Sequence, residues 1–310
     1  MSQYIVPNGL IGGKGGTTSF YETKFQTGIM LQRVDVWYDS SCLRGLRFTW
    51  TDGTFKMYAS SKGNSQQITF APGELCRELV LWGNGVGTRT GRIKIVTEKQ
   101  TFECGKNVSG QDAYPMNIGS GLLVGFRGAC GNDIDRLSPL FLKVMKSLTS
   151  DVTYSSFPTG GITPVQLDTQ TFDSRNRAVY QWEFSGSRKR VVSNTWSQSS
   201  NWAFGLSMKI QAGIPLVASI ENGAEWSMSG TSSHSTTETQ ERELTWSISG
   251  VLETGHAVKC TALCQEGKTS LDYTSKVTVT FKDGKQFTFT ESGNLDSISV
   301  SDCKVDVVDL

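Results

Sequence analysis

Apolar residues alternate with small or polar residues in the second half of the chain, and a period of two is typical of β-strands with one apolar face. The alternation covers residues 202–212, is interrupted at residues 213–217 and resumes in the same phase over residues 218–228. This pattern predicts two amphipathic strands that meet at a short turn and form a β-hairpin, within residues 195–232.

The register of this predicted hairpin follows from the position of its turn. If Ala212 faces Ala218, the apolar side chains share one face, and Lys209 lies opposite Glu221 on the other face with Glu225 beside it. Each strand has about 11 residues, and at roughly 3.3 Å per residue and a tilt near 40° it spans about 28 Å. That length is close to the hydrocarbon thickness of a bilayer.

The predicted turn is apolar, because it contains Ile214, Leu216 and Val217, whereas hairpin turns of soluble proteins are normally polar. Half-buried strands of a soluble sheet give the same alternation, so two interpretations stay open. A membrane-crossing hairpin must join hairpins of other chains in a closed barrel, since a single hairpin leaves unpaired backbone groups in lipid. The predicted membrane-inserting residues are Trp202, Phe204, Leu206, Met208, Ile210, Ile214, Pro215, Leu216, Val217, Ile220, Trp226 and Met228. Lys209, Glu221 and Glu225 are predicted to line the lumen.

The rest of the chain also predicts an all-β protein with two domains. Short alternating runs separated by glycines fill residues 10–146, and one of these predicted strands covers residues 140–145. Residues 147–164 are predicted to be a linker, and the basic residues 188–190 a turn between longer Ser- and Thr-rich strands. The predicted domains are residues 1–148 and residues 149–310.

Composition excludes several classes of function. Lysine and arginine number 30 and aspartate and glutamate 29, so the net charge of +1 gives no basic surface for nucleic acid. The seven cysteines are an odd number, are spread along the chain and form no CxxC motif, and the chain has only two histidines; this indicates reduced core thiols and no metal site. No nucleophile elbow or pair of carboxylates with catalytic spacing occurs, so we expect neither an enzyme nor a cofactor.

The first ten residues contain no charged leader followed by an apolar run. We therefore expect a soluble protein without a cleavable signal peptide, which is either cytoplasmic or secreted by an unconventional route before it reaches a target-cell membrane.

Two glycine-rich loops in the first half carry the candidate chemistry. Residues 12–16 do not form a P-loop, because Lys14 is followed by glycine and no helical pattern follows. Residues 125–135 include Asp133 and Asp135, whose spacing also occurs in metal sites, but a sugar site is chemically simpler. Backbone N–H groups of a glycine-opened turn and one carboxylate together match the donors and acceptors of adjacent hydroxyls.

Three features of the first half stand out: the opening loop at residues 10–16, the predicted strand that contains Val34, Val36 and Trp37, and the segment 131–135, which is followed by the predicted strand at residues 140–145. Together they resemble a jacalin-type lectin. This resemblance covers residues 1–148 and implies a β-prism of three Greek-key sheets with a mannose-type sugar site. In that site Gly131 would open one loop, in which Asn132, Asp133 and Ile134 would offer backbone donors. Asp135 would accept hydrogen bonds from sugar hydroxyls, and Gly15 and Gly16 would close the other side of the site.

The second half resembles the aerolysin-type pore-forming module, above all at residues 214–217 and the alternating strand that follows them. Taken together, the two halves resemble the natterin-like, jacalin–aerolysin proteins of fish and lampreys. The resemblance implies an elongated second module and a glycan-targeted pore-forming protein of innate defence or cytotoxicity. Its partners would be cell-surface glycans of the mannose type or complex N-glycans, a lipid membrane, and further copies of the chain, with a soluble dimer as one open route. The alternative is a non-lytic lectin or agglutinin whose second half is an oligomerisation stalk.

Overall fold

The structure is a computed structural model that describes residues 3–83, 88–198, 207–220 and 223–310. Within these ranges the regular elements are β-strands, apart from the 3₁₀ turn η1 (Phe25–Thr27). The predicted all-β fold class is therefore confirmed. No helix in the described ranges is long and apolar enough to cross a membrane.

Contacts within the chain define two compact units, which we describe separately. Unit 1 comprises Met1–Thr149, Ser200–Met208 and Lys276–Glu291. Unit 2 comprises Ser150–Ser199, Lys209–Ser275 and Ser292–Leu310. Unit 1 is thus not a continuous stretch of sequence, because it takes in a segment from near the C-terminal end of the chain.

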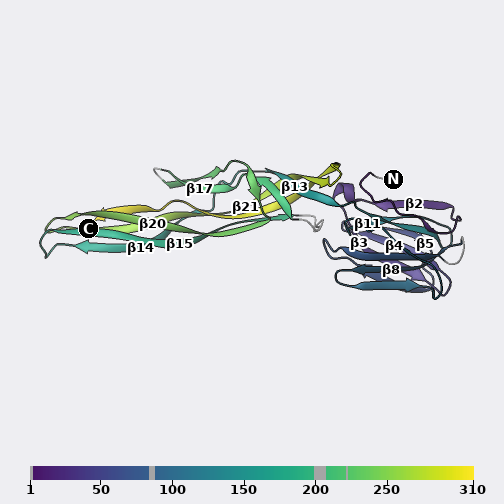
Figure 1. Cartoon of the computed structure of the whole chain (residues 1–310). Coiled ribbons are helices and arrows are strands. Elements are labelled where there is room, and N and C mark those ends of the chain that lie inside the picture. Colours follow the sequence, from purple (N-terminus) through teal and green to yellow (C-terminus); the bar gives the residue numbers. More distant parts are fainter. Residues whose placement is uncertain (1–2, 84–87, 199–206, 221–222) are drawn as a thin grey trace. The chain divides into compact units, whose positions relative to one another are not determined.

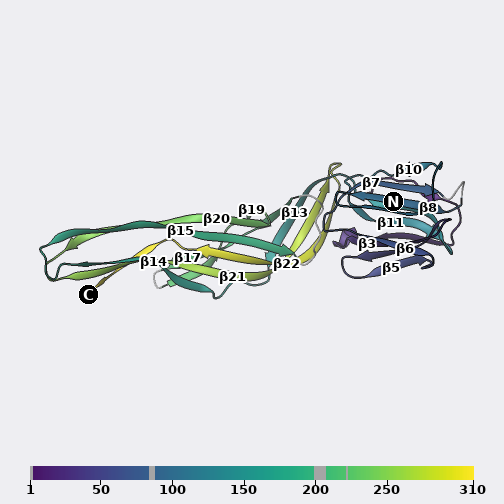
Figure 2. The same cartoon turned by 90° about the horizontal axis from the view of Figure 1, so that it is seen from below.

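Unit 1 contains three four-stranded sheets, which form the predicted β-prism (Figures 1 and 2). In spatial order the first sheet consists of β1 (Ile11–Gly12), β12 (Ile134–Phe141), β11 (Leu123–Cys130) and β2 (Thr18–Thr23). The second consists of β10 (Ala113–Pro115), β7 (Cys76–Gly83), β8 (Thr90–Thr97) and β9 (Thr101–Gly105). The third consists of β5 (Phe55–Ala59), β4 (Leu43–Trp50), β3 (Leu31–Tyr38) and β6 (Asn64–Thr69).

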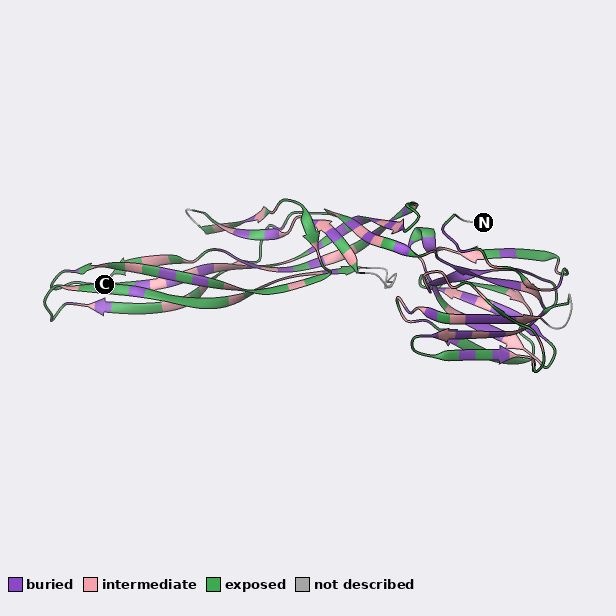
Figure 3. Ribbon diagram, viewed as in Figure 1, coloured by how far each residue is buried: buried purple, intermediate pink, exposed green. Residues whose placement is uncertain are grey.

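The core of the prism forms because alternate residues of each strand point inward, where the three sheets meet. Phe48 of β4 and Phe126 of β11 are fully buried and stack with their ring centroids 5.3 Å apart. Leu79 of β7 and Ile93 of β8 belong to the same buried cluster. Figure 3 shows this alternation as buried and exposed bands along the strands.

The predicted strand at residues 140–145 is wrong. Strand β12 ends at Phe141, and β13 (Met145–Tyr154) begins after a short break. Leu142, inside the break, is fully buried and bridges to Ile5. Leu142 and Met145 are buried on either side of exposed Val144, so the sequence stays apolar through the break although the strand does not continue.

Unit 1 has a second buried cluster, to which the ends of two long strands contribute. Strands β21 (Ala257–Phe281) and β22 (Gln286–Val300) are joined by the turn at residues 283–284. Phe281 and Phe287 pack on Tyr4, with ring centroids 5.3 Å from it in both cases. These contacts place Lys276–Glu291 in unit 1.

A nine-stranded sheet carries the second half of the chain. Its main path runs β19 (Ser232–His234), β16 (Met208–Ala212), β13, β21, β22, β15 (Tyr180–Gln198) and β20 (Thr237–Leu252). Both β14 (Ile162–Asp173) and β23 (Lys304–Asp309) pair with β21. The core of unit 2 is rich in aromatic residues, and Phe172 lies 5.1 Å from Trp182 between ring centroids.

Two predictions for the second half are corrected by this sheet. The predicted linker at residues 147–164 is mostly strand, because β13 continues to Tyr154 and β14 begins at Ile162. The predicted turn at residues 188–190 lies inside β15, which pairs with β20 without interruption. Basic residues are tolerated there because they meet acids: Lys189 Nζ lies 2.9 Å from Glu241 Oε2, and Arg190 pairs with Glu266.

Candidate functional site

The two glycine loops of the predicted sugar site come together around the carboxylate of Asp135. Gly15 lies in the loop between β1 and β2, and Gly131 in the loop between β11 and β12. A Cβ atom added at Gly15 would lie 2.5 Å from Asp135 Oδ1, and one at Gly131 would lie 3.8 Å from Asp135 Oδ2. Both loops therefore border the same carboxylate, and a side chain at position 15 would displace it.

The backbone holds the first glycine loop against β12. The Gly13 N–H donates to the carbonyl of Asp135 at 2.7 Å, and Arg136 Nη1 donates to the carbonyl of Lys14 at 3.4 Å. Gly16 has a φ of 88° and passes so close to β11 that an added Cβ would lie 2.9 Å from the Cys130 nitrogen. The loop is thus fixed on both neighbouring strands.

The remaining predicted sugar-site residues differ in exposure. Gly131 and Asn132 are exposed, whereas Ile134 is fully buried and pairs with Cys130 in the β11–β12 ladder. Asp135 is of intermediate exposure, so its carboxylate is accessible from solvent.

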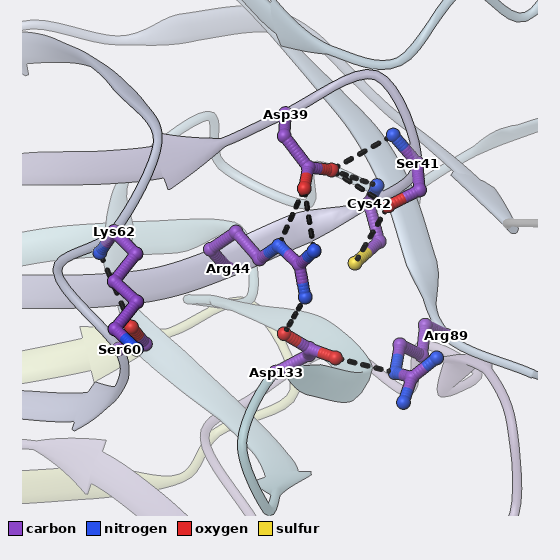
Figure 4. A network of polar contacts seen from close by, with 8 residues as sticks. All are labelled: Asp39, Ser41, Cys42, Arg44, Ser60, Lys62, Arg89 and Asp133. Carbon is purple, nitrogen blue, oxygen red and sulfur yellow. Dashed lines mark hydrogen bonds and ion pairs between the residues drawn. The ribbon is translucent and has the colours of Figure 1, made fainter.

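Asp133, two residues before Asp135, has a side chain that is only 4% exposed and is held by two arginines (Figure 4). Its Oδ1 accepts from Arg44 Nη1 at 2.5 Å, and its Oδ2 lies 2.8 Å from Arg89 Nε. The Asp133 carboxylate is therefore occupied in the protein, and Asp135 carries the acceptor that remains available at this loop.

A second aspartate extends this network to the turn after β3. Arg44 donates from Nε to Asp39 Oδ2 at 2.6 Å, and Asp39 Oδ1 accepts from the Ser41 hydroxyl at 2.7 Å and from the Ser41 and Cys42 N–H groups. The Ser41 hydroxyl, then the two N–H groups and Arg44, hold the pKa of Asp39 well below its usual value despite its desolvation. The bonds to Asp133 and Asp39 raise the pKa of Arg44.

Sequence reasoning did not identify Asp39, Arg44 or Arg89 as parts of this region. Asp39 and Arg44 lie five residues apart around one turn, but Arg89 and Asp133 are each tens of residues away in the sequence, and no spacing motif links them. Only the prism topology brings the β3–β4 turn, the residues before β8 and the β11–β12 loop to one end of unit 1.

A β-hairpin is present in the segment where the sequence predicted one, but its register is different from the predicted one. Strand β17 (Pro215–Ile220) pairs with β18 (Gly223–Met228), so that Val217 faces Trp226 and Ile220 faces Gly223. The predicted pairing of Ala212 with Ala218 is wrong, because the chain reverses after Ile220 and not at residues 213–217.

The reason for this difference is a change of phase. Ile210 and Ala212 are buried in β16, whereas Pro215 and Val217 are buried in β17. Two intervening residues, Gly213 and Ile214, shift the apolar face from even to odd positions. The apolar residues of the sequence continue in even positions across this change, so the sequence pattern does not show where the chain turns.

The two strand pairs form one longer hairpin with a bend. Strand β16 pairs with β19, with Ile210 opposite His234, and the Ser229 N–H donates to the carbonyl of Ile214 at 2.9 Å between this pair and the β17–β18 pair. One arm of the hairpin therefore covers residues 208–220 and the other residues 223–234. At roughly 3.3 Å per residue and a 40° tilt, arms of about 12 or 13 residues span about 30 Å.

The β17–β18 part of this hairpin packs on the large sheet of unit 2 through few side chains. Val217 and Trp226 lie over Gly267 of β21, where an added Cβ would overlap both. Trp226 Nε1 donates to the carbonyl of Gly160 at 2.8 Å, and the Val217 N–H donates to Ser299 Oγ at 3.1 Å. Hydrogen bonding assigns β17 and β18 to a two-stranded sheet of their own, alongside the large sheet (Figure 1).

The predicted membrane-inserting residues are partly exposed and partly buried. The exposed ones are Leu216 at 39%, Ile220 at 47% and Met228 at 36%. The buried ones are Ile210, Pro215, Val217 and Trp226, and those of intermediate exposure are Met208 and Ile214. Trp202, Phe204 and Leu206 lie outside the described residues.

The predicted lumen residues do not have the arrangement that the sequence suggested. Lys209 is exposed on β16, and Glu225 is exposed on β18 opposite Ala218. Glu221 lies outside the described residues. Because β16 pairs with β19, the predicted alignment of β16 with residues 218–228 is not the one observed.

Comparison with known proteins defines the class of the first half. Residues 8–138 match the family model of the Jacalin-like lectin domain. The N-terminal part of the chain is therefore a jacalin-like lectin domain, a class of carbohydrate-binding domain, and the prism and its two glycine loops agree with that assignment.

The whole chain is similar in structure to lamprey immune protein. The match has a TM-score of 0.86 at 25% sequence identity and covers 100% of both chains. A mannose-binding jacalin-related lectin from Ananas comosus covers 44% of this chain and 98% of its own, with 21% identity and a TM-score of 0.37. A mannose-specific jacalin-related lectin from Morus nigra, solved with mannose, covers 46% of this chain and 96% of its own, with 18% identity and a TM-score of 0.37. No curated protein sequence matches the chain.

Proposed function

We propose that this chain is a carbohydrate-directed pore-forming protein. Its lectin domain binds a cell-surface glycan of the mannose type or a complex N-glycan, and several chains gather on the membrane. Their hairpins, residues 208–234, then join in one closed barrel that permeabilises the bilayer. The observation that carries this proposal is the hairpin itself. Its arms are long enough to span a membrane, and its strands β17 and β18 pair with each other in a separate two-stranded sheet rather than with the large sheet.

The sugar-binding step relies on the Asp135 carboxylate and the loops that border it. A carboxylate accepts hydrogen bonds from two adjacent sugar hydroxyls, while backbone N–H groups of residues 131–134 donate to their oxygens. The absence of a side chain at Gly15 and Gly131 leaves the space that a sugar ring needs. The ion pairs of Asp133 hold the loop in place before the ligand arrives, which lowers the entropic cost of binding.

The insertion step relies on the two faces of the hairpin. Pro215, Val217, Trp226 and Met228 share the face that meets the large sheet, and this face is the more apolar one. The opposite face carries Glu225 with Ala218, Gly223 and Ser227, and this part of it suits a water-filled lumen. Leu216 and Ile220 lie on the same face, and Ile220 is next to the turn, which would enter the lipid first. Release of the hairpin would transfer its apolar face from the sheet to lipid. Backbone groups would stay paired along the hairpin and gain partners in neighbouring chains.

Assembly on a glycan-bearing surface follows from avidity. Chains held at one membrane have a high effective concentration, so weak contacts between them suffice for association. A barrel closes only when each hairpin has a neighbour on both sides, which makes permeabilisation dependent on binding by several chains.

A disulfide tether tests whether the hairpin must leave the sheet. Val217→Cys combined with Ser299→Cys places two thiols at positions that are already in contact, because the Val217 N–H donates to Ser299 Oγ at 3.1 Å. The oxidised double variant should bind sugar normally but release no dye from glycan-bearing liposomes, and reduction should restore release. Val217→Cys alone, treated in the same way, controls for the native thiols. Full release from the oxidised double variant would contradict insertion of this hairpin, and a wild-type protein that binds sugar but never releases dye would be a non-lytic lectin.

A further inference from the structure

Cys264 lies in β21, and Cys303 directly precedes β23, the strand that pairs with β21 in antiparallel orientation. Strand β23 pairs with β21 in a register that ends with Lys304 opposite Leu263. One step further along, the same register places Cys303 opposite Cys264. The chains remain in contact beyond that point, because the Ser301 N–H donates to the carbonyl of Gln265 at 2.9 Å.

The separation of these positions suits a disulfide bond. Directly opposed residues of an antiparallel pair have Cα atoms about 4.5 to 5.5 Å apart, and disulfides join Cα atoms about 4.4 to 6.8 Å apart. Lys304 lies opposite Leu263, and the Ser301 N–H is hydrogen-bonded to Gln265. Between these two points Cys264 on one strand faces two residues, Asp302 and Cys303, on the other, which is the arrangement of a β-bulge.

The two side chains also share a face. Cys260, Ala262 and Cys264 alternate along the buried face of β21. Cys303 and Val305 both pack against the buried cluster that contains Cys260 and Ala262.

Other thiols of the chain lack such a partner in the strand registers. Cys260 lies opposite Val307, and Cys104 lies opposite Ile93. Cys76 lies opposite Thr97, and Cys130 opposite Thr18 and Ile134. All seven cysteines are free thiols in this structure.

We propose that Cys264 and Cys303 are an oxidisable pair that forms a cross-strand disulfide by exchange with a small-molecule disulfide such as oxidised glutathione. The Cys303 thiolate, which is the more exposed of the two, attacks one sulfur of the glutathione disulfide and releases one glutathione thiolate. The Cys264 thiolate then attacks the Cys303 sulfur and releases the second. The protein dithiol loses two electrons and two protons, and one glutathione disulfide is reduced to two thiols.

The reaction should depend strongly on pH. Burial, and for Cys303 also the neighbouring Cys264, raises the pKa of both thiols. Arg190 and Arg242 favour the Cys264 thiolate, and Glu266 opposes it. Since the thiolate is the attacking species, the rate of disulfide formation should rise about tenfold per pH unit below the thiol pKa.

The bond would fasten the C-terminal strand β23 to β21 and close a long loop of chain. Such a cross-link restricts the unfolded chain, so the melting temperature of the oxidised protein should rise by several degrees. The proposal depends only on the β21–β23 register and is independent of the proposed function.

The test is incubation of the full chain with oxidised glutathione at pH 8.5, followed by alkylation of free thiols and peptide mapping without reduction. We expect a linked peptide pair that contains Cys264 and Cys303, together with a reversible rise in melting temperature. Cys260→Ser, on the same strand and face, should keep both results, whereas Cys303→Ser should lose both. Glutathione that remains on Cys303 without a link, alkylation of both residues, or a link between Cys303 and another cysteine would each overturn the proposal.

Discussion

Val217 and Trp226 face each other across the β17–β18 hairpin, and both side chains pack over the same glycine, Gly267 of β21. Because an added Cβ at that glycine would overlap both of them, the fit between hairpin and sheet depends on a single position without a side chain. Hydrogen bonds from Trp226 Nε1 and the Val217 N–H complete the contact.

Gly267→Val should therefore release the hairpin from the sheet. Overpacking of a buried contact costs roughly 1 to 3 kcal/mol, enough to shift a docking contact of a few side chains toward the released state. We expect faster proteolysis and faster amide hydrogen exchange over residues 208–234, measured by mass spectrometry. Gly230→Ala is the matched control, because an added Cβ there meets nothing within 4 Å. Unchanged exchange in the valine variant would show that the contact does not hold the hairpin.

Asp135→Asn tests the acceptor of the sugar site. The change removes a charge but keeps the size of the side chain, and a charge-assisted hydrogen bond is worth roughly 1.5 to 3 kcal/mol. Binding to a mannoside, measured by isothermal titration calorimetry, should weaken by about tenfold to a hundredfold. Asp112→Asn changes an exposed carboxylate elsewhere in unit 1 and should leave affinity unaltered. Equal affinity of the Asp135 variant and the wild type would move the site elsewhere.

Gly15→Ala tests the space beside the same carboxylate. The new methyl group would lie 2.5 Å from Asp135 Oδ1, so the carboxylate must turn away from its present position. Affinity for the mannoside should fall by roughly tenfold, while the melting temperature should change little because the methyl group meets only the end of a side chain. Gly9→Ala, where an added Cβ meets nothing within 4 Å, serves as the control. Wild-type affinity in Gly15→Ala would argue that the sugar does not contact Asp135.

The Asp39–Arg44 network predicts how acid affects unit 1. The pKa of Asp39 is lowered in the folded protein, so its contribution to stability is fully present above the unfolded carboxyl pKa of about 3.9 and is lost as pH falls further. The free energy of unfolding, measured by urea titration, should therefore decline below about pH 4. In Asp39→Asn this decline should be shallower. An identical acid profile would show that the network contributes nothing measurable.

Asp133→Asn should weaken the anchor of the sugar loop. The substitution leaves Arg44 and Arg89 without the carboxylate that both contact, at a cost of roughly 1 to 3 kcal/mol because the arginines are partly exposed. We expect a lower melting temperature, with sugar affinity that falls less than in Asp135→Asn. A larger loss of affinity than of stability would indicate that Asp133 contacts the sugar itself.

Period-two alternation was sufficient to predict the all-β class and many strands, because each strand has one buried face. Strand β3 contains Val34, Val36 and Trp37, which the sequence placed in one strand, and the turn at residues 283–284 coincides with an Asp-Gly sequence, which is typical of hairpin turns. The turn of the hairpin could not be placed, because the buried positions change from even to odd numbers at Gly213 and Ile214, and the apolar pattern of the sequence does not show which residues are buried. Residues 188–190 were assigned to a turn because the acids that pair with them come from β20 and β21.

The sugar site could be predicted only in part, for a similar reason. Glycines and a carboxylate in two loops are visible as a local motif, and the fold does bring Gly15 and Gly131 to Asp135. The arginines that hold Asp133 come from distant segments, and no local pattern marks them. Long-range pairing of this kind requires the three-dimensional structure.

The most direct test of a glycan-directed pore is dye release from liposomes that contain or lack a mannose-terminated lipid. The wild-type protein and the Ile220→Asp variant are compared at concentrations that give equal sugar binding. Ile220 is 47% exposed, so the change should not harm the folded chain, but a charge near the hairpin turn must cross lipid at a cost of about 2 to 4 kcal/mol. We predict release that requires the glycan and is lost in the variant. Equal release by both proteins, or none from glycan-bearing liposomes, would contradict the account.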